Sequence, residues 1–237
     1  MPLSIVCNDV TALCNRCQIS AARTVHGGPE YETGAVVPAG LWQPLAAETA
    51  KHMLPGTGMR DSTLVEIIAP PLPAVALENF GANLGDPTAV YLGQAHSKPD
   101  TLTTTDNQKS GQRIGLHLDN WDRLPYSAKD SARRRLCLNL GPGTRYLLLC
   151  LLDAQALGRA VHPDDYADRH PHTDDLRAYV AAGNRLRCLR IRLDPGDGYI
   201  APTEYLPHDG STEDELKPSS AAFWLGRWPS GSIPSLI

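Results

Sequence analysis

Short apolar stretches that end at glycine or proline fill the second half of the chain. Residues 135–140 (RLCLNL) and 187–193 (RCLRIRL) alternate between apolar and polar side chains, whereas residues 145–152 (RYLLLCLL) are apolar almost throughout. Alternation is typical of a strand with one buried face, and a continuous apolar run of a strand covered on both faces. The intervening segments 141–143 (GPG) and 194–197 (DPGD) suit tight turns. We therefore expect a β-sandwich or barrel.

Signals for helices are few. Apolar side chains recur at helical spacing over residues 41–54, before a Pro-Gly stop, and predict one helix. Residues 62–69 and 89–96 predict further strands. An insertion over residues 153–185 contains a second predicted helix, with Thr173 as its N-cap and Asp174 and Asp175 in its first turn. The pattern as a whole indicates a mainly β fold with helical buttresses, an α+β arrangement.

Composition and charge narrow the class of protein. The net charge of −4, with both signs scattered along the chain, argues against a nucleic-acid partner. No apolar run is long enough to span a membrane, and the N-terminus lacks the basic and apolar segments of a secretory signal. We expect a cytoplasmic protein without a membrane partner. Residues 1–237 are expected to form a single domain, because barrels and sandwiches often reach this length.

The cysteines raise the possibility of a zinc site. Cys14 and Cys17 have the C-x-x-C spacing of structural zinc ligands, with Cys7 upstream and His26 downstream. Only one such pair occurs and the other spacings are irregular, so we interpret all six cysteines as reduced thiols. The sequence contains neither a G-x-S-x-G nucleophile elbow nor a phosphate-binding glycine loop.

The strongest candidate for chemistry is the segment of residues 113–119 (RIGLHLD). In an extended chain its three apolar side chains point to one face, and His117 and Asp119 to the other. An imidazole and a carboxylate need one more ligand to form a 2-His-1-carboxylate set, which leaves open positions on Fe(II). We take His208, far along the chain, as the third ligand.

The His-x-Asp pattern alone is not specific, because it also occurs at residues 162–164 and 172–174. Those two copies lie in a polar segment before a helix, with no strand pattern behind them. We interpret them as solvated loop residues and helix-capping acids. For His117 and Asp119 the alternative is a buried histidine that is hydrogen bonded to a nearby acid on a structural strand.

The order of elements favours the metal site. A His-x-Asp strand is followed by two strands, an insertion, the sequence LDPGDGYIAP, a histidine, and a last strand that carries an arginine. This order resembles the double-stranded β-helix, a jelly-roll (cupin-like) core, of the Fe(II)/2-oxoglutarate-dependent dioxygenases. The resemblance covers about residues 110–230, and residues 1–109 fit the variable support that such enzymes carry. It implies that His117, Asp119 and His208 bind Fe(II), with 2-oxoglutarate as cosubstrate.

The resemblance also implies a basic residue that binds the far carboxylate of 2-oxoglutarate. Arg227, on the last strand predicted over residues 221–228, matches it, although it lies farther beyond His208 than is usual in the family. Arg145 is the alternative, because some branches of the family anchor the carboxylate from that strand. Either arginine suits the task, because a planar guanidinium donates two parallel hydrogen bonds to a carboxylate. Asn139 is a candidate for a further hydrogen bond to the cosubstrate.

Residues beside the predicted metal are candidates for substrate contact. Asn120, Trp121 and Asp122 follow the His-x-Asp pattern directly, and Arg135 shares the polar face of its strand. The alternative is a tight turn in which the tryptophan plugs the core. Residues 97–112 are polar and without periodicity, as lids and binding loops often are. These features suit a small polar, amino-acid-like or natural-product metabolite.

The resemblance implies a reaction class. It predicts hydroxylation, or another oxidation of a C–H bond, by O2 with succinate and CO2 as co-products. The presence of Asp119 favours hydroxylation over halogenation, in which the family usually frees that coordination position. Two alternatives stay open: a cupin-like binding protein without turnover, and a non-haem iron oxygenase that does not use 2-oxoglutarate.

Overall fold

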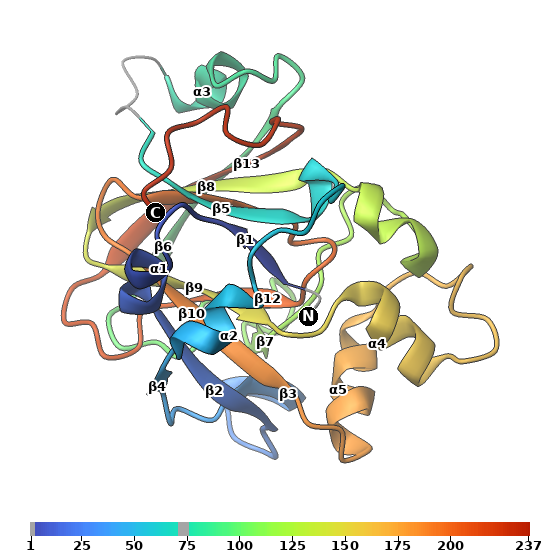
Figure 1. Ribbon diagram of the computed structural model, residues 1–237. Helices are drawn as coiled ribbons and strands as arrows, with labels where there is room; N and C mark the ends of the chain where they lie inside the picture. Colours follow the sequence, from blue (N-terminus) through green and yellow to red (C-terminus); the bar gives the residue numbers. More distant parts are fainter. Residues whose placement is uncertain (1–2, 71–75) are drawn as a thin grey trace.

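Two curved β-sheets face each other in the computed structural model, which describes residues 3–70 and 76–237 (Figure 1). The sheets enclose most of the apolar core and together form a mainly β, nearly closed, barrel-like fold. The predicted mainly β class, with a sandwich or barrel architecture, is therefore confirmed. In Figure 1 the first sheet forms the upper layer and the second sheet the lower one.

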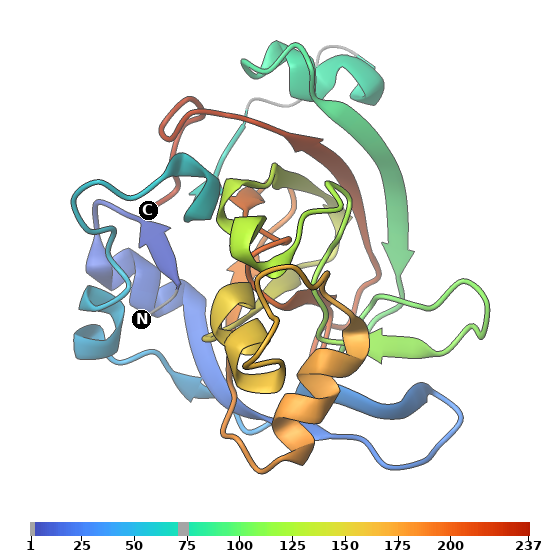
Figure 2. The same ribbon diagram turned by 90° about the vertical axis from the view of Figure 1, so that its right-hand side faces the viewer.

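The first sheet has six strands within the described residues: β1 (Ser4–Val6), β5 (Leu64–Ile68), β6 (Val90–Ser97), β8 (Arg134–Pro142), β11 (Gly198–Ala201) and β13 (Ser219–Gly226). Their order across the sheet is β1-β5-β11-β8-β13-β6. All neighbours run antiparallel except β1 and β5, which are parallel. Figure 2 shows β6 and β13 curving together along one side of the molecule.

The second sheet consists of β2 (Cys17–Thr24), β3 (Tyr31–Pro38), β7 (Arg113–Gly115), β9 (Arg145–Cys150), β10 (Arg187–Leu193) and β12 (His208–Ser211), with the short β4 (Gln43–Pro44) beside β2. Their order is β12-β9-β10-β2-β3-β7. Strands from the N-terminal third thus extend both sheets. The chain before residue 110 is part of the same two layers.

Helices lie around the two sheets, and two of them contribute Leu13 and Ala50 to the core between the sheets. The helices are α1 (Val10–Arg16), α2 (Ala47–Lys51), α3 (Leu77–Asn83), α4 (Ala154–Val161) and α5 (Thr173–Ala181), with 3₁₀ helices η1 (Asp61–Thr63) and η2 (Tyr126–Ser131). In Figure 1, α3 lies above the first sheet, and α4 and α5 lie at the side of the second. None of the helices in the described ranges is both long and apolar enough to cross a membrane.

The continuous apolar run over β9 is buried on both faces, as the sequence predicts. Leu147 and Leu149 belong to the core between the sheets. Leu148 and Cys150 belong to a second cluster, which packs under α4 and α5. Arg145, the first residue of this strand, therefore lies at the end of a strand that is packed on both faces.

Most predicted strands are present with bounds shifted by a few residues, but the helix predicted over residues 41–54 is wrong. Gln43 and Pro44 pair with β2, and only Ala47–Lys51 is helical. Proline restricts the residue before it to extended backbone, which favours the strand. The insertion over residues 153–185 holds two helices rather than one.

Candidate metal centre

The structure brings His117, Asp119 and His208 together in the interior. One ligand atom from each side chain lies within 4.8 Å of the others, and all three side chains are buried. Within the part of the chain that the structure describes, no other group of three or more histidine, cysteine or acidic side chains is placed to hold a metal. Cys14 and Cys17, the alternative metal site, therefore lack a third ligand there, and both are free thiols.

A turn after β7 delivers His117 to the site. Gly115 ends this strand with φ +74°, a conformation that favours glycine, and a Cβ there would collide with the main chain of Val36. The chain then meets β12, where His117 and His208 exchange main-chain hydrogen bonds of 3.1 and 2.8 Å. Their ring centroids lie 4.7 Å apart. Pairing between distant segments thus sets the two imidazoles side by side.

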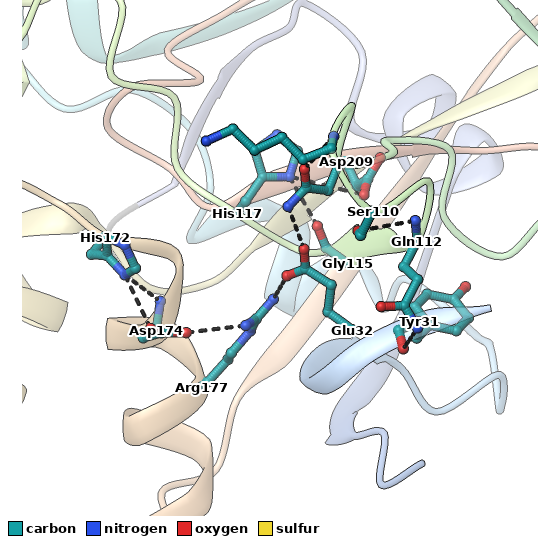
Figure 3. A network of polar contacts seen from close by, with 12 residues as sticks. Tyr31, Glu32, Ser110, Gln112, Gly115, His117, His172, Asp174, Arg177 and Asp209 are labelled. Carbon is teal, nitrogen blue, oxygen red and sulfur yellow. Dashed lines mark hydrogen bonds and ion pairs between the residues drawn. The ribbon is translucent and has the colours of Figure 1, made fainter. Parts of the chain in front are cut away.

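The histidines present nitrogen atoms that suit a metal. Nδ1 of His117 lies 2.9 Å from the carbonyl oxygen of Gly115 (Figure 3). Because a carbonyl only accepts hydrogen bonds, Nδ1 carries the proton and Nε2 is left as the ligand atom. Burial lowers the pKa of His208 to about 3, although the Asp119 carboxylate opposes this shift. His208 is therefore neutral near pH 7, and the neutral form binds metals.

Asp119 is fixed through its main chain and charged through its side chain. Its N–H donates to the carbonyl of Thr203 at 3.1 Å, and its own carbonyl accepts from Nζ of Lys129 at 3.2 Å. Nη2 of Arg135 lies 2.6 Å from Oδ2 of Asp119 in a buried ion pair. Burial opposes ionisation, but the charge of Arg135 outweighs it and lowers the pKa of Asp119 to about 2.

A cavity of about 320 Å³ opens beside His208. Strands of both sheets contribute to its wall, together with residues 104–106. Aromatic side chains on this wall are Tyr146, Tyr199 and Phe223. Size and lining suit a small molecule held between an apolar surface and a few charged groups.

Arg145 lines this cavity as a buried cation that lies over the ring of Phe223, 5.9 Å from its centroid. The residue is only 4% exposed, and its Nη1 has no hydrogen-bond partner. No carboxylate among the described residues forms an ion pair with it. Gly210 leaves room for the guanidinium, because a Cβ at that position would lie 2.7 Å from Nη2. A buried charge without a counter-charge is costly, so the cavity favours an anionic ligand beside His208.

Two further cavity residues were not identified from the sequence. Asp209 is buried, and its Oδ1 accepts from Thr105 Oγ1 at 2.8 Å, while its Oδ2 lacks a hydrogen bond and lies 3.9 Å from Nδ1 of His117. Burial raises the pKa of Asp209 and, more strongly, that of Tyr199. No periodicity marks either residue, and their only signals were their places next to His208 and in the LDPGDGYIAP sequence.

The polar segment 97–112, expected to serve as a lid, is a fixed part of the wall. The main-chain N–H of Thr104 donates to β12 at 3.0 Å. Asn107 Nδ2 donates to Glu32 Oε1 at 2.6 Å. Figure 3 shows that Glu32 also meets Arg177 of α5, so the segment is tied through β3 to the insertion.

Two of the three predicted cosubstrate contacts lie elsewhere. Arg227 follows the end of β13, and its guanidinium donates to the carbonyl of Ser131 at 3.0 Å, beside a different hollow. Asn139 Nδ2 donates to the carbonyl of Gly143 at 3.0 Å and fixes the turn between β8 and β9. Of the three, Arg145 lines the cavity together with His208.

Of the four predicted substrate contacts, only Arg135 lines the cavity. Asn120 is exposed, and Trp121 is 53% exposed, so it does not plug the core either. Asp122 forms an ion pair with Arg133 at 2.5 Å. These three residues therefore build the turn after Asp119 rather than the wall of the cavity.

Comparison of the chain with protein-family models and with curated proteins found no match. The site itself defines a chemistry. Two imidazoles and an ionised carboxylate are a donor set for a divalent transition metal. The buried guanidinium of Arg145 in the adjoining cavity can donate charge-assisted hydrogen bonds to a carboxylate. The arrangement can hold a metal and an organic anion side by side.

Proposed function

We propose that the protein is a non-haem Fe(II)- and 2-oxoglutarate-dependent dioxygenase. It hydroxylates, or otherwise oxidises, a C–H bond of a small polar, amino-acid-like or natural-product metabolite and releases succinate and CO2. The observation that carries the proposal is that Arg145, a buried cation without a carboxylate partner among the described residues, lines the same cavity as His208. Neither a structural metal site nor a core histidine cluster needs a buried, uncompensated cation next to it.

The strand order supports a double-stranded β-helix, or jelly-roll, core. In the first sheet β6, β13, β8 and β11 are successive neighbours. In the second, the His117 segment bridges to β12, followed by β9 and β10. Eight segments arranged in two such sets of four are the pattern of a jelly roll. In this core the metal ligands lie on two paired segments of one sheet.

Each residue then has a distinct task. His117, Asp119 and His208 hold Fe(II), and Arg145 holds the far carboxylate of 2-oxoglutarate. When bound, the iron would activate O2 with two electrons from the oxidative decarboxylation of 2-oxoglutarate, so that one oxygen atom would go to succinate and the other to the substrate. Arg135 keeps the carboxylate of Asp119 ionised. The fixed wall of the cavity orients the substrate and excludes water.

An anaerobic titration with Fe(II) and 2-oxoglutarate tests the proposal. We expect a weak visible charge-transfer band that requires both additions. Arg145→Leu should raise the Kd for 2-oxoglutarate by about 30-fold or more, since a bound carboxylate loses its buried charge partner. Arg227→Leu is the matched control and should leave this Kd unchanged, because Arg227 does not line the cavity.

The other outcomes identify the alternatives. Iron binding without a band would replace the proposal with an oxygenase that does not use 2-oxoglutarate. No metal binding at all would leave a cupin-like binding protein. A band that is lost in Arg227→Leu and kept in Arg145→Leu would place the cosubstrate outside this cavity.

A further inference from the structure

A buried ion pair lies next to the metal centre without lining its cavity. Lys129 of η2 and Glu204 of the β11–β12 connector have fully buried side chains, and Nζ lies 2.9 Å from Oε2. The ammonium also donates to the carbonyl oxygen of Asp119 at 3.2 Å and to Oδ1 of Asn120 at 2.8 Å. Its three protons thus have three acceptors. One of these acceptors belongs to a metal ligand.

The connector reaches Asp119 from a second direction. Thr203 accepts the main-chain N–H of Asp119 at 3.1 Å, and Oε1 of Glu204 accepts the N–H of Asp122 at 2.7 Å. Both main-chain groups of Asp119 are therefore held by the connector, one directly and one through Lys129. The same connector leads into β12, which carries the third ligand.

Strand pairing does not hold Asp119. β7 ends at Gly115, and only His117 forms a bridge to β12. Asp119 lies beyond that bridge, so its position relative to His208 depends on contacts of the loop that contains it. The structure provides contacts of Thr203 and Lys129 with the main chain of Asp119 and an ion pair of Arg135 with its carboxylate.

We infer that Lys129 and Glu204 form a clasp that positions Asp119 relative to His208 and so sets the affinity for the metal. They are positioning residues, because they contact the main chain of a ligand and its neighbours. Partners of this kind are important for metal affinity, since they fix the orientation of the ligand before the ion arrives. The inference rests on the metal centre of the proposed function and does not depend on 2-oxoglutarate.

The chain contains a matched control pair. Arg134 and Glu66 are also buried, with Nη1 2.6 Å from Oε2. Glu66 Oε1 accepts from the N–H of Gly231 at 2.7 Å, so this pair ties β5 and β8 to the C-terminal segment. It contacts none of the metal-binding side chains. Substitutions there disturb an equally buried charge pair without touching the metal centre.

Lys129→Met keeps an unbranched side chain and removes the ammonium. The full chain, freed of metal, is titrated anaerobically with Fe(II) alone under conditions in which urea unfolding curves show each variant to be folded. Lys129→Met should weaken Fe(II) binding by about tenfold or more. Glu66→Gln should change the Kd by less than about twofold, although both substitutions lower the midpoint of unfolding.

A double variant separates positioning from stability. Lys129→Met combined with Glu204→Leu removes both buried charges, and an apolar replacement of a buried pair often restores stability. The carbonyl of Asp119 still lacks its donor, so Fe(II) binding should remain weak while the unfolding midpoint recovers. Affinity that recovers together with stability would overturn the clasp, as would an unchanged Kd in Lys129→Met. A parent protein that binds no Fe(II) would overturn the metal centre itself, a distinguishable failure.

Discussion

The same His-x-Asp pattern occurs in two regions of the molecule with different environments. At residues 117–119 both side chains are buried, and β12 brings a second histidine against the first. In the insertion, at residues 162–164 and 172–174, the pattern lies around the ends of α4 and α5. The difference between these regions shows what turns a common spacing into a site.

In the insertion the histidines serve helix ends. His162 follows α4, and its Nε2 lies 2.8 Å from Oδ1 of Asp175. His172 precedes α5, and its Nδ1 accepts from the N–H of Asp174 at 3.2 Å in a capping box. The side chains of His172 and Asp174 are mostly exposed. The predicted acids Asp174 and Asp175 do lie in the first turn of α5, but the N-cap is His172 and not the predicted Thr173.

What distinguishes residues 117–119 is the pairing with a distant segment. His117 meets His208 because β7 turns at Gly115 and the chain then bridges to β12. Neither copy in the insertion is joined by a third ligand within the described ranges. The His-x-Asp spacing thus supplies two candidate ligands, and the fold brings the third, His208, from a distant part of the chain.

Substitution of the three histidines tests this comparison and carries the largest expected effect. His117→Ala should abolish Fe(II) binding, because two ligands remain of three. His162→Ala and His172→Ala should leave the Kd for Fe(II) as in the parent. Anaerobic titration followed by equilibrium dialysis measures all three. Loss of binding in His172→Ala with a folded protein would place a metal in the insertion instead.

Part of the candidate metal centre could be predicted because its signals are local. The pattern of residues 113–119 places His117 and Asp119 on one face, although the strand that it predicts ends at Gly115, and the apolar run of β9 identifies a strand covered on both faces. His208 required the order of elements as well. Each of these predictions used either residues that are close in the sequence or an order of elements that resembles the dioxygenase family.

The partners of the site could not be predicted, because they depend on contacts between distant segments. Lys129 reaches Asp119 only through the packing of η2 against the β11–β12 connector. The sequence favoured Arg227 over Arg145 by its place on the last predicted strand, although its spacing from His208 is longer than usual. The fold turns one into the cavity and the other toward Ser131.

Acidification provides a second test of the difference between the candidate metal centre and the insertion, because His208 is buried and neutral in the folded state. Its folded pKa of about 3 lies below its ordinary value, so the unfolded chain binds a proton first as pH falls. The stability that this group contributes is complete above its ordinary pKa of about 6.5 and is lost toward pH 3. Asp119 also contributes stability that is lost as pH falls, but at lower pH, because its folded pKa is about 2.

We therefore expect the metal-free protein to lose several kcal/mol of unfolding free energy between neutral pH and pH 4. Urea unfolding curves at intervals of pH measure this loss. His208→Gln, which cannot gain a proton, should show a flatter dependence over the same range. An equal slope in parent and variant would assign the loss to other groups and contradict the burial of a neutral histidine.

The smallest expected effect concerns Asp175, the buried acid of the insertion. Its Oδ2 accepts from the hydroxyl of Tyr126 at 2.8 Å and from the N–H of His172 at 2.9 Å, while Oδ1 faces His162. Asp175→Ala leaves these donors unpaired and should lower the unfolding free energy by about 2 kcal/mol. Fe(II) affinity should remain that of the parent in the folded variant. A parallel loss of affinity would show that the insertion and the metal centre are coupled through η2, and the two regions would then be one functional unit.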